Sequence, residues 1–377
     1  MTETSKICFL QVAHLPDDDR VWFHQAKLLK ENCFYVSVIS TRTAHSKLEN
    51  VFCFDDTEMN KSAVCKKISE ILHQINPNII ICDNPLAVFF ASKYRRKYNK
   101  KVKILIDITE WYPSKKNLVH LTGFKRLFKK IVLECLNLSS GFLVDGFIFG
   151  EYHKAQFFKK YFKRKSYVDL PYYPDLKYIT IGKQKNSFST WNLMYGGPLT
   201  KNKGFDNILS VMKITALDNP SVHFTLNIIS DDTVNEEQKS EILEFPAHVE
   251  VKYHPYLPFE QFCKEISQYD IFLDLREKDN ENNKCLPIKL FYYMACGRPS
   301  IFSDLDAIRL QVSNIDEFAH LMNPRDYHHI SHIITEYIKN NETYFKHSAA
   351  ALKYSGETYN WGMLSDKFLK FIQEQLV

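Results

Sequence analysis

The sequence predicts an α/β protein with two doubly wound parallel sheets, and three observations support this fold class. The chain has 377 residues, which is more than one hydrophobic core usually needs and suits two domains of about 150–200 residues. Short apolar runs alternate with stretches of helical spacing in both halves of the chain. A polar segment with prolines, at 171–190, separates the halves and lacks clear periodicity.

In the first half, five apolar runs rich in Ile, Val and Phe are predicted to be buried strands of a parallel sheet. They are KICFLQV, FYVSVIS, NIIIC, VKILIDI and GFLVDGFIF. Between them, RVWFHQAKLLKEN and NPLAVFFASKYRRKY have the apolar spacing of helices. Alternation of strand and helix is typical of a Rossmann-like, doubly wound sheet.

The second half repeats this pattern. Its predicted strands are LMYGG, HFTLNIIS, HVEVKY, DIFLDL and PSIFS, and its predicted helices are FDNILSVMKI, FEQFCKEISQY and IKLFYYMAC. A last helix, at about 361–375, follows the polar break SGETYN. The predicted division is therefore 1–178, 179–358 and 359–377.

Composition excludes several classes of protein. Hydrophobic residues make up 45% of the chain and aromatic residues 14%, which argues against disorder. The nine cysteines form no CxxC pair, so we expect neither a disulfide framework nor a zinc site, and a reducing, cytoplasmic compartment fits better. The first residues do not resemble a signal peptide, and no run of eighteen apolar residues predicts a membrane span.

One segment of the second half, LMYGGPLTKNKGFDNIL at 193–209, predicts a site for an anion. Its strand ends at Gly196 and Gly197, where a backbone without side chains can approach a ligand closely. Gly204 begins an amphipathic helix, whose free N–H groups favour anions, and Lys203 adds positive charge. An ordinary strand-to-helix turn with solvated lysines fits this segment equally well when it is taken alone.

A second segment, NNKCLPIKLFYYMACGRPSIFSD at 282–304, has a related pattern. Pro287 suits the first turn of a helix, and Lys289 lies just inside that turn. Taken alone, the segment is better explained by core packing of Tyr292 and Tyr293. Two helix N-termini with nearby lysines in one domain, however, together predict a binding site for a diphosphate.

The order of these motifs resembles the retaining GT-B glycosyltransferases of family 4. YGGPLTKNKG at 195–204 is similar to the family's Y-x-G-x-L-x-x-x-K-G stretch, and PIKLFYYMACGRP at 287–299 to its P-x-K-x-F-E-Y-M-A-x-G-x-P stretch. In the first half, HLPDDDRVWFHQAKLL and DITEWYP resemble the family's opening loop and helix and its D-x-H-E-x-x-P segment. The terminal YNWGMLSDKFLKFI resembles the helix that crosses back to the first domain. The resemblance implies two domains that face each other across a cleft.

The resemblance also implies the activity. Family members transfer a sugar from a nucleotide diphosphate donor with retention, so we expect a UDP- or GDP-linked sugar as substrate, without a cofactor or a metal. The second domain would bind this donor, and Lys203 matches the family's diphosphate-binding lysine. The remaining residues of the predicted donor site are Gly196, Gly197, Tyr256, Leu257, Leu286, Pro287, Ile288, Lys289 and Tyr292.

The first domain would bind the acceptor of the sugar. His14, Asp19, Arg20 and Asp107 follow predicted strands and could hydrogen-bond sugar hydroxyls. Asp17 and Asp18 are better explained as caps of the next helix. Glu110 fits a site motif of the family, and Thr109 stands where many members carry a histidine, so both are predicted catalytic residues together with Lys203.

Three departures from the family's pattern leave an alternative function open: Gly197 stands where the family often carries an arginine, Thr109 stands where many members carry a histidine, and a pair of glutamates is replaced. Lys284 and Tyr292 stand where the family carries a pair of glutamates. We therefore keep two hypotheses: an active glycosyltransferase of surface polysaccharide synthesis that uses a glycan or lipid-linked acceptor, and a binding subunit that has lost catalysis.

The charge of the first half suggests an anionic partner. Residues 93–165 contain 19 Lys and Arg against 5 Asp and Glu. In GFKRLFKKIVLECLNL, one helical face would carry Phe124, Phe128, Ile131 and Cys135, with lysines opposite. The whole segment predicts peripheral contact with an anionic membrane at its inner face, although packing of the apolar face into the domain would also explain this helix. Nucleic-acid binding is a weaker alternative, because no nucleic-acid motif accompanies the basic residues.

Overall fold

The computed structural model describes residues 4–12, 14–42, 48–114 and 117–377. The chain forms two compact units: Met1–Tyr172 with Gly362–Val377, and Tyr173–Trp361. The boundaries predicted from the sequence were 178/179 and 358/359. The structure assigns 173–178 and 359–361 to the second unit, because residues of these two segments pack there. The Tyr173 ring lies 4.8 Å from Phe291 and 5.4 Å from Tyr359.

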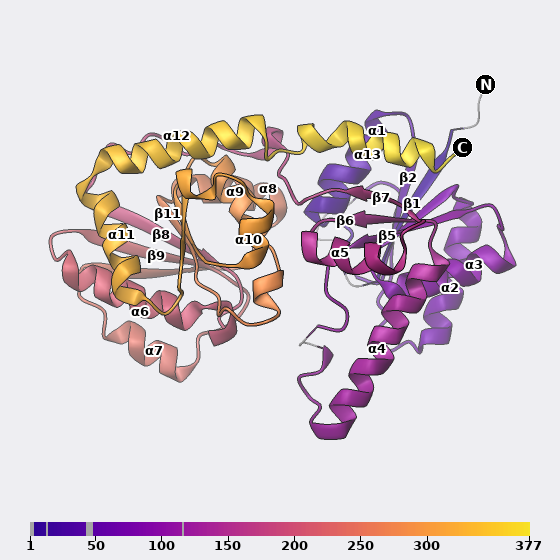
Figure 1. Cartoon of the computed structure of the whole chain (residues 1–377), viewed down its shortest axis with the longest axis horizontal. Helices are drawn as coiled ribbons and strands as arrows, with labels where there is room; N and C mark the ends of the chain where they lie inside the picture. Colours follow the sequence, from indigo (N-terminus) through magenta and orange to yellow (C-terminus); the bar gives the residue numbers. More distant parts are fainter. Residues whose placement is uncertain (1–3, 13, 43–47, 115–116) are drawn as a thin grey trace. The chain divides into compact units, whose positions relative to one another are not determined.

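Unit 1 contains a seven-stranded, all-parallel sheet with the order β3-β2-β1-β4-β5-β6-β7 (Figure 1). The strands are β1 (Lys6–Gln11), β2 (Tyr35–Ser40), β3 (Val51–Cys53), β4 (Ile79–Cys82), β5 (Lys103–Ile108), β6 (Gly146–Phe149) and β7 (Ser166–Asp169). The strand order changes direction between β1 and β4. In such sheets, ligands bind beyond the carboxyl ends of the strands at this point.

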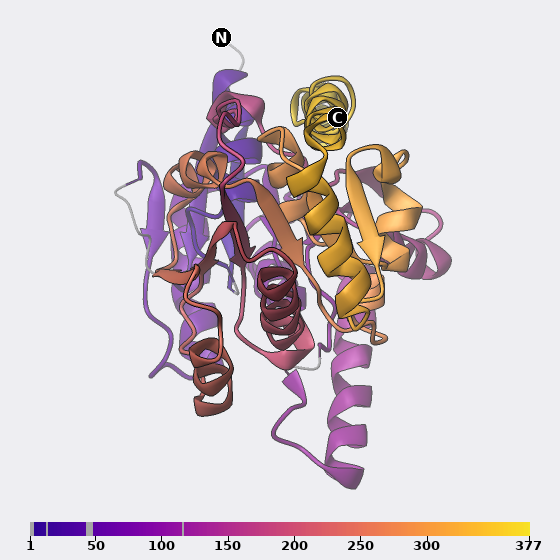
Figure 2. The ribbon, with the colours of Figure 1, turned by 90° about the vertical axis from the view of Figure 1, so that its left-hand side faces the viewer.

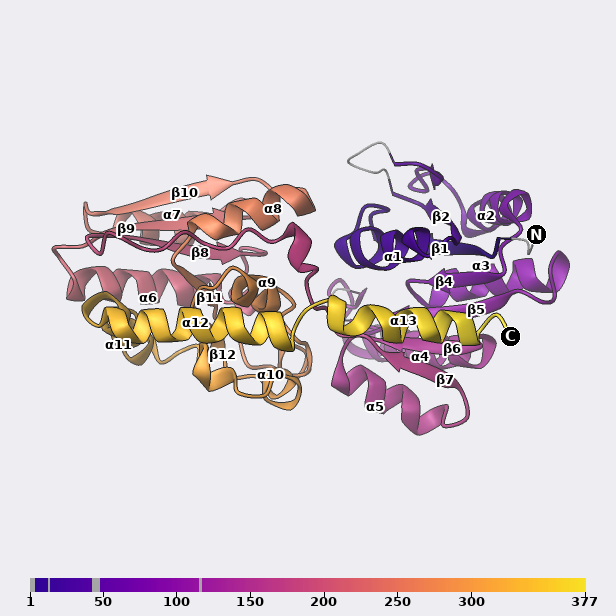
Figure 3. The same ribbon diagram turned by 90° about the horizontal axis from the view of Figure 1, so that it is seen from above.

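The helices of unit 1 cover its sheet. They are the π-helix η1 (Asp19–Ala26), α1 (Lys27–Glu31), α2 (Lys61–Ile75), α3 (Pro85–Lys97), α4 (Gly123–Leu143), α5 (Tyr152–Tyr161) and α13 (Gly362–Glu374). Asn60 and Asn84 begin α2 and α3 by accepting hydrogen bonds from backbone N–H groups of the first turn. Helix α13 packs against β7 and α1, which places the last helix on the first domain as predicted (Figure 3).

One predicted strand of unit 1 is shorter than expected. The run GFLVDGFIF was predicted as a single strand, but Gly141 to Leu143 complete helix α4 and only Gly146–Phe149 form β6. Asp145 separates the two elements, and its carboxylate accepts hydrogen bonds from the Ile104 backbone N–H and from Arg95.

Unit 2 repeats the architecture with six parallel strands in the order β10-β9-β8-β11-β12-β13. The strands are β8 (Thr190–Gly196), β9 (His223–Ile229), β10 (Val249–His254), β11 (Ile271–Asp274), β12 (Ser300–Ser303) and β13 (Ala319–Met322). Here the strand order changes direction between β8 and β11. With unit 1, this confirms the predicted α/β fold class of two doubly wound sheets.

The helices of unit 2 are α6 (Phe205–Asp218), α7 (Glu236–Leu243), α8 (Phe259–Glu265), α9 (Lys289–Ala295), α10 (Asp306–Gln311), α11 (Tyr327–Lys339) and α12 (Asn341–Glu357). Short 3-10 turns include η4 (Lys201–Lys203) and η6 (Asn282–Lys284). Leu193 and Tyr195 of β8 point into one core and Met194 into the other, so the sheet is buried on both faces. Among the described residues, no helix is long and apolar enough to cross a bilayer.

Candidate functional site

The candidate site of unit 2 begins where β8 ends, beside the change in strand order. The buried Tyr195 donates its hydroxyl hydrogen to the Pro198 carbonyl oxygen at 2.7 Å, which folds the following loop back over the strand end. A side chain at Gly196 would have its Cβ 2.9 Å from the Met194 methyl group and 3.5 Å from Lys289 Nζ. The Met194 methyl group and the Tyr293 hydroxyl, which would be 3.2 Å away, therefore leave no room for a Cβ here, whereas Lys289 would be at an ordinary contact distance.

Gly204 joins this loop to helix α6 in a backbone conformation with φ of 84°. A Cβ at this position would lie 2.0 Å from the Leu275 carbonyl oxygen. Only glycine, which has no Cβ, allows the loop to lie directly on the backbone that follows β11. The glycine predicted from the sequence to begin α6 thus also brings two strand ends together.

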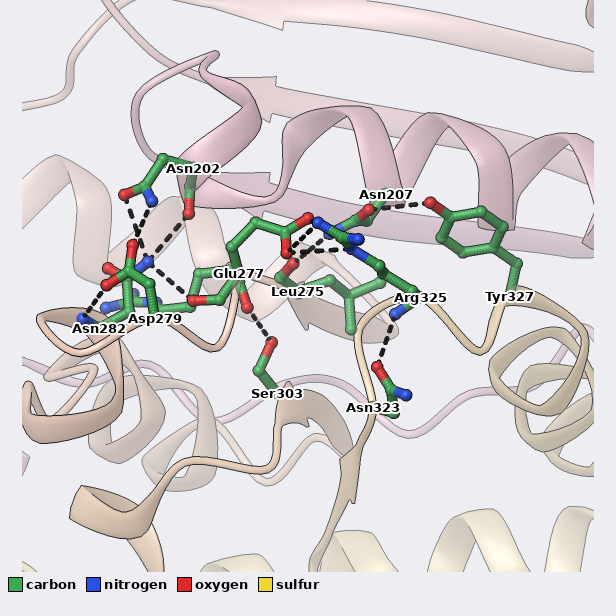
Figure 4. Close-up of polar contacts among 11 residues, drawn as sticks. Asn202, Asn207, Leu275, Glu277, Asp279, Asn282, Ser303, Asn323, Arg325 and Tyr327 are labelled. Carbon is green, nitrogen blue, oxygen red and sulfur yellow. Dashed lines mark hydrogen bonds and ion pairs between the residues drawn. The ribbon is translucent and has the colours of Figure 1, made fainter.

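A polar network joins the two loops (Figure 4). The side-chain amide of Asn282, which is buried, donates to the Asn202 carbonyl oxygen at 3.0 Å and to the Glu277 carbonyl oxygen at 2.9 Å. Asn207 donates to the Leu275 carbonyl oxygen at 2.9 Å. The 195–204 motif and the segment beginning at residue 282 are therefore parts of one structure, held by the loop after β11.

Three cationic side chains meet at these strand ends. Lys289 Nζ donates to the Gly196 carbonyl oxygen at 2.7 Å, and Lys203 Nζ donates to Asn282 Oδ1 at 3.0 Å. Arg276 pairs with Asp274 of β11, with Nε 2.7 Å from Oδ1. Arg276 was not predicted, although its place directly after a buried strand beside β8 was a usable signal.

The electrostatics of this cluster favour a bound anion. Burial lowers the pKa of Lys289 to about 8; Asp274 opposes this shift and Arg276 adds to it. Burial also lowers the pKa of Lys203, and Arg276 lowers it further. Three cations lie near the Asp274 carboxylate, and Glu281 also lies near Lys203, so positive charge exceeds negative charge here and phosphate oxygens would balance it.

The other predicted donor residues of unit 2 differ in their surroundings. Tyr292 is buried in the core, with its ring 6.0 Å from Phe259 and 6.2 Å from Phe262. Tyr256 is exposed, and its backbone N–H donates to Asp231 Oδ1. Leu257 packs against the core, Leu286 and Pro287 are buried, and Ile288 is half-buried. Helix α9 has seven residues and begins at Lys289, two residues after the helix start predicted at Pro287.

In unit 1, some predicted residues meet at the change in strand order. His14 Nε2 lies 3.2 Å from Thr109 Oγ1, which joins the ends of β1 and β5. Asp83, directly after β4, accepts hydrogen bonds from the backbone N–H groups of Val12 at 2.9 Å and His14 at 3.3 Å. Sequence analysis missed Asp83, because its role depends on a neighbouring strand.

Arg20 and Asp107 form a buried ion pair. Arg20 Nε and Nη2 donate to the two Asp107 oxygens at 2.7 and 2.9 Å, and Gln25 also donates to Asp107. The Arg20 guanidinium lies over the Tyr172 ring, 4.4 Å from its centroid. Arg20 and Asp107 therefore contribute to the packing of unit 1. Their contact with a sugar stays a prediction. Asp19, half-buried, begins η1 behind the cap Asp18.

The two predicted catalytic residues of unit 1 lie on a loop that a buried lysine holds. Lys154 Nζ donates to the Thr109 carbonyl oxygen at 2.5 Å and to Glu151 Oε1 at 2.5 Å. The Tyr172 hydroxyl donates to the same Thr109 oxygen. Glu110, the next residue, is exposed. Lys154 belongs to the basic segment 93–165 that predicts membrane contact, but the structure buries it inside unit 1.

Comparison with known proteins extends the fold assignment. No protein-family model and no curated protein sequence matches the chain. Among solved structures, sucrose-phosphate synthase from Thermosynechococcus elongatus is 11% identical, with a TM-score of 0.73 and 98% of each chain covered. Anabaena HepE in complex with UDP-glucose is 11% identical, with a TM-score of 0.70 and coverage of 98% of this chain and 99% of HepE. A putative UDP-N-acetylglucosamine 2-epimerase from Listeria monocytogenes is 11% identical, with a TM-score of 0.64 and coverage of 98% and 96%. The chain therefore has the fold of GT-B glycosyltransferases, and an epimerase shares that fold.

Proposed function

We propose that this chain is a retaining glycosyltransferase that moves a sugar from a UDP- or GDP-linked donor to a glycan or lipid-linked acceptor in surface polysaccharide synthesis. The observation that carries the proposal is the cluster of Lys203, Arg276 and Lys289 beside the bare backbone of Gly196. It lies at the carboxyl ends of β8 and β11, where doubly wound sheets bind their ligands.

The chemistry of this cluster suits a nucleoside diphosphate as leaving group. When the bond between sugar and diphosphate breaks, negative charge grows on the phosphate oxygens, and cations already in place stabilise that charge. The two lysines have lowered pKa values in the protein alone, so a diphosphate would relieve an unfavourable charge state. The HepE structure, which holds UDP-glucose in the same fold, supports this donor class. No cofactor and no metal is part of the proposal.

The acceptor side belongs to unit 1 in this proposal. Glu110 and Thr109 would contact the reacting sugar, and His14, bonded to Thr109, would help to orient it. We place the protein in the cytoplasm with peripheral contact at the inner face of an anionic membrane through residues 93–165, since this segment is strongly basic.

The donor site is tested by calorimetric titration with UDP and GDP. Lys203→Ala should weaken binding of the preferred nucleotide at least tenfold, because a charged hydrogen bond contributes about 1.5–3 kcal/mol. Lys201→Ala is the matched control, since Lys201 lies in the same short turn but is exposed. Its affinity should stay within about twofold of the unmodified protein. Unchanged binding in Lys203→Ala would overturn the proposed donor site.

A non-catalytic binding subunit is the second candidate. Lys284 is exposed and Tyr292 is buried among aromatic rings, so neither replaces the carboxylate expected at its place. The two candidates differ in turnover. A transferase should release free nucleotide from its nucleotide-sugar, and Glu110→Gln should abolish this release without weakening nucleotide binding. Tight nucleotide binding with no release, even with acceptor extracts, would favour the binding subunit.

A further inference from the structure

Helix α4 of unit 1 carries an apolar stripe that the other described residues of unit 1 leave exposed. Phe124 is 80% exposed, Leu127 55%, Phe128 60% and Ile131 49%. Their spacing of three and four residues places them on one face of the helix. Large apolar side chains are seldom exposed together in this way unless the surface binds something.

The helix is attached to unit 1 by a different face. Its buried residues are Leu133, Asn137, Ser140 and Gly141. At about 100° per residue, these point to the side opposite the apolar stripe. Helix α4 packs on α3, and its first turns extend beyond the sheet and the other helices of unit 1 (Figures 1 and 2). The alternative that the apolar face packs into the domain is therefore wrong for this helix.

Basic residues accompany the stripe. Lys125, Arg126, Lys129 and Lys130 are all exposed, and Lys125 and Lys130 border the stripe on its two sides. Lysine is depleted at the centre of interfaces between proteins, whereas helices that lie in a bilayer surface combine Lys and Arg with Phe and Leu. The pattern therefore favours an anionic lipid surface over a second copy of this chain.

We infer that residues 123–132 of α4 form an interfacial anchor that binds the surface of an anionic lipid bilayer. Phe124, Leu127, Phe128 and Ile131 enter the boundary between headgroups and acyl chains. Lys125 and Lys130, on the two borders of the stripe, contact lipid phosphates. This inference specifies the membrane contact of the proposed function. It rests on that function only because a lipid-linked acceptor would explain why the protein binds a membrane.

Co-sedimentation of the full chain with vesicles tests the inference. Vesicles of phosphatidylcholine with phosphatidylglycerol should bind the protein, and vesicles of phosphatidylcholine alone should bind it far more weakly. Phe124→Ser/Phe128→Ser should reduce partition to the anionic vesicles at least tenfold. Lys125→Gln/Lys130→Gln should reduce it by about 30-fold. Leu243→Ser is the control, because Leu243 is 85% exposed but lies on α7 of unit 2; its partition should not change.

Three results would overturn the inference: no binding of the unmodified protein to anionic vesicles, equal binding by Phe124→Ser/Phe128→Ser, or a lipid-free dimer that this variant dissociates in sedimentation velocity. Thermal unfolding checks that each variant is folded. Titration with UDP and GDP separates the two proposals, since the anchor lies in unit 1 and the lysine cluster in unit 2. Vesicle binding without nucleotide binding refutes the donor site alone, and the reverse result refutes the anchor alone.

Discussion

At the scale of single residues, Lys289 connects the electrostatics of unit 2 with its proposed ligand. Its ammonium group is bonded to a backbone carbonyl and close to the charges of Asp274 and Arg276. Burial makes the charged form costly in the protein alone, and its pKa is about 8. A bound diphosphate would favour the charged form and raise this pKa again.

The lowered pKa predicts how nucleotide affinity changes with pH. Below about pH 8, Lys289 is already protonated in the protein alone, so binding takes up no proton there and affinity is flat. Above about pH 8, the group must gain a proton on binding, so affinity should fall by up to tenfold per pH unit. Calorimetry between about pH 7 and 9 measures this decline. Lys289→Gln serves as the comparison and should bind more weakly with a flatter profile, because it has no proton to gain. An equal decline in both proteins would contradict the prediction.

At the scale of elements, the strands that sequence patterns failed to predict lie at the edges of the sheets. β3 and β13 have only a short apolar run, and in β7 only Val168 is buried. An edge strand has one neighbour and is partly exposed, so its sequence need not be apolar. The central strands were predictable because both faces are buried, as the continuous run of β8 shows.

The candidate site was predictable only where it is continuous in sequence. The glycines and Lys203 of the 195–204 motif show as one pattern, because one turn needs all of them. Asn282 and Asp83 do not, since their partners lie on strands far away in the chain: Asn202 is 80 residues from Asn282, and Val12 is 71 residues from Asp83. Such contacts appear only once the strand order is known.

Gly204 tests how closely the loop after β8 must approach the loop after β11. Gly204→Ala adds a Cβ 2.0 Å from the Leu275 oxygen in a left-handed conformation. We expect a loss of more than about 2 kcal/mol in the stability of unit 2 and a parallel loss of nucleotide affinity, because the two loops must separate. Gly123→Ala is a matched control, since its φ is also positive, at 53°, but nothing lies within 4 Å of the new Cβ. It should cost only about 1 kcal/mol. Thermal unfolding and UDP or GDP titration measure both effects, and similar losses for the two variants would contradict the steric argument.

At the scale of the whole molecule, the chain leaves unit 1 after Tyr172 and returns to it at Gly362. Unit 1 is therefore completed by residues that follow all of unit 2 in the sequence. Leu364, Phe368, Phe371 and Ile372 form the buried face of α13, and the helix packs on β7 and α1. Because β7 is an edge strand, α13 covers a part of unit 1 that the preceding chain leaves open.

This discontinuity predicts that one substitution near the end of the chain weakens the first unit and spares the second. Phe368 is fully buried, so Phe368→Ala should cost unit 1 about 3–5 kcal/mol. Hydrogen exchange should then become faster in β1, β5 and β7, while β8 and β9 keep their protection, since opening of one packed unit need not open another. Lys367→Ala, at an exposed site on the same helix, should change neither. If exchange in β8 and β9 rose as much as in β7, the two units would unfold together and the assignment of α13 to unit 1 alone would be wrong.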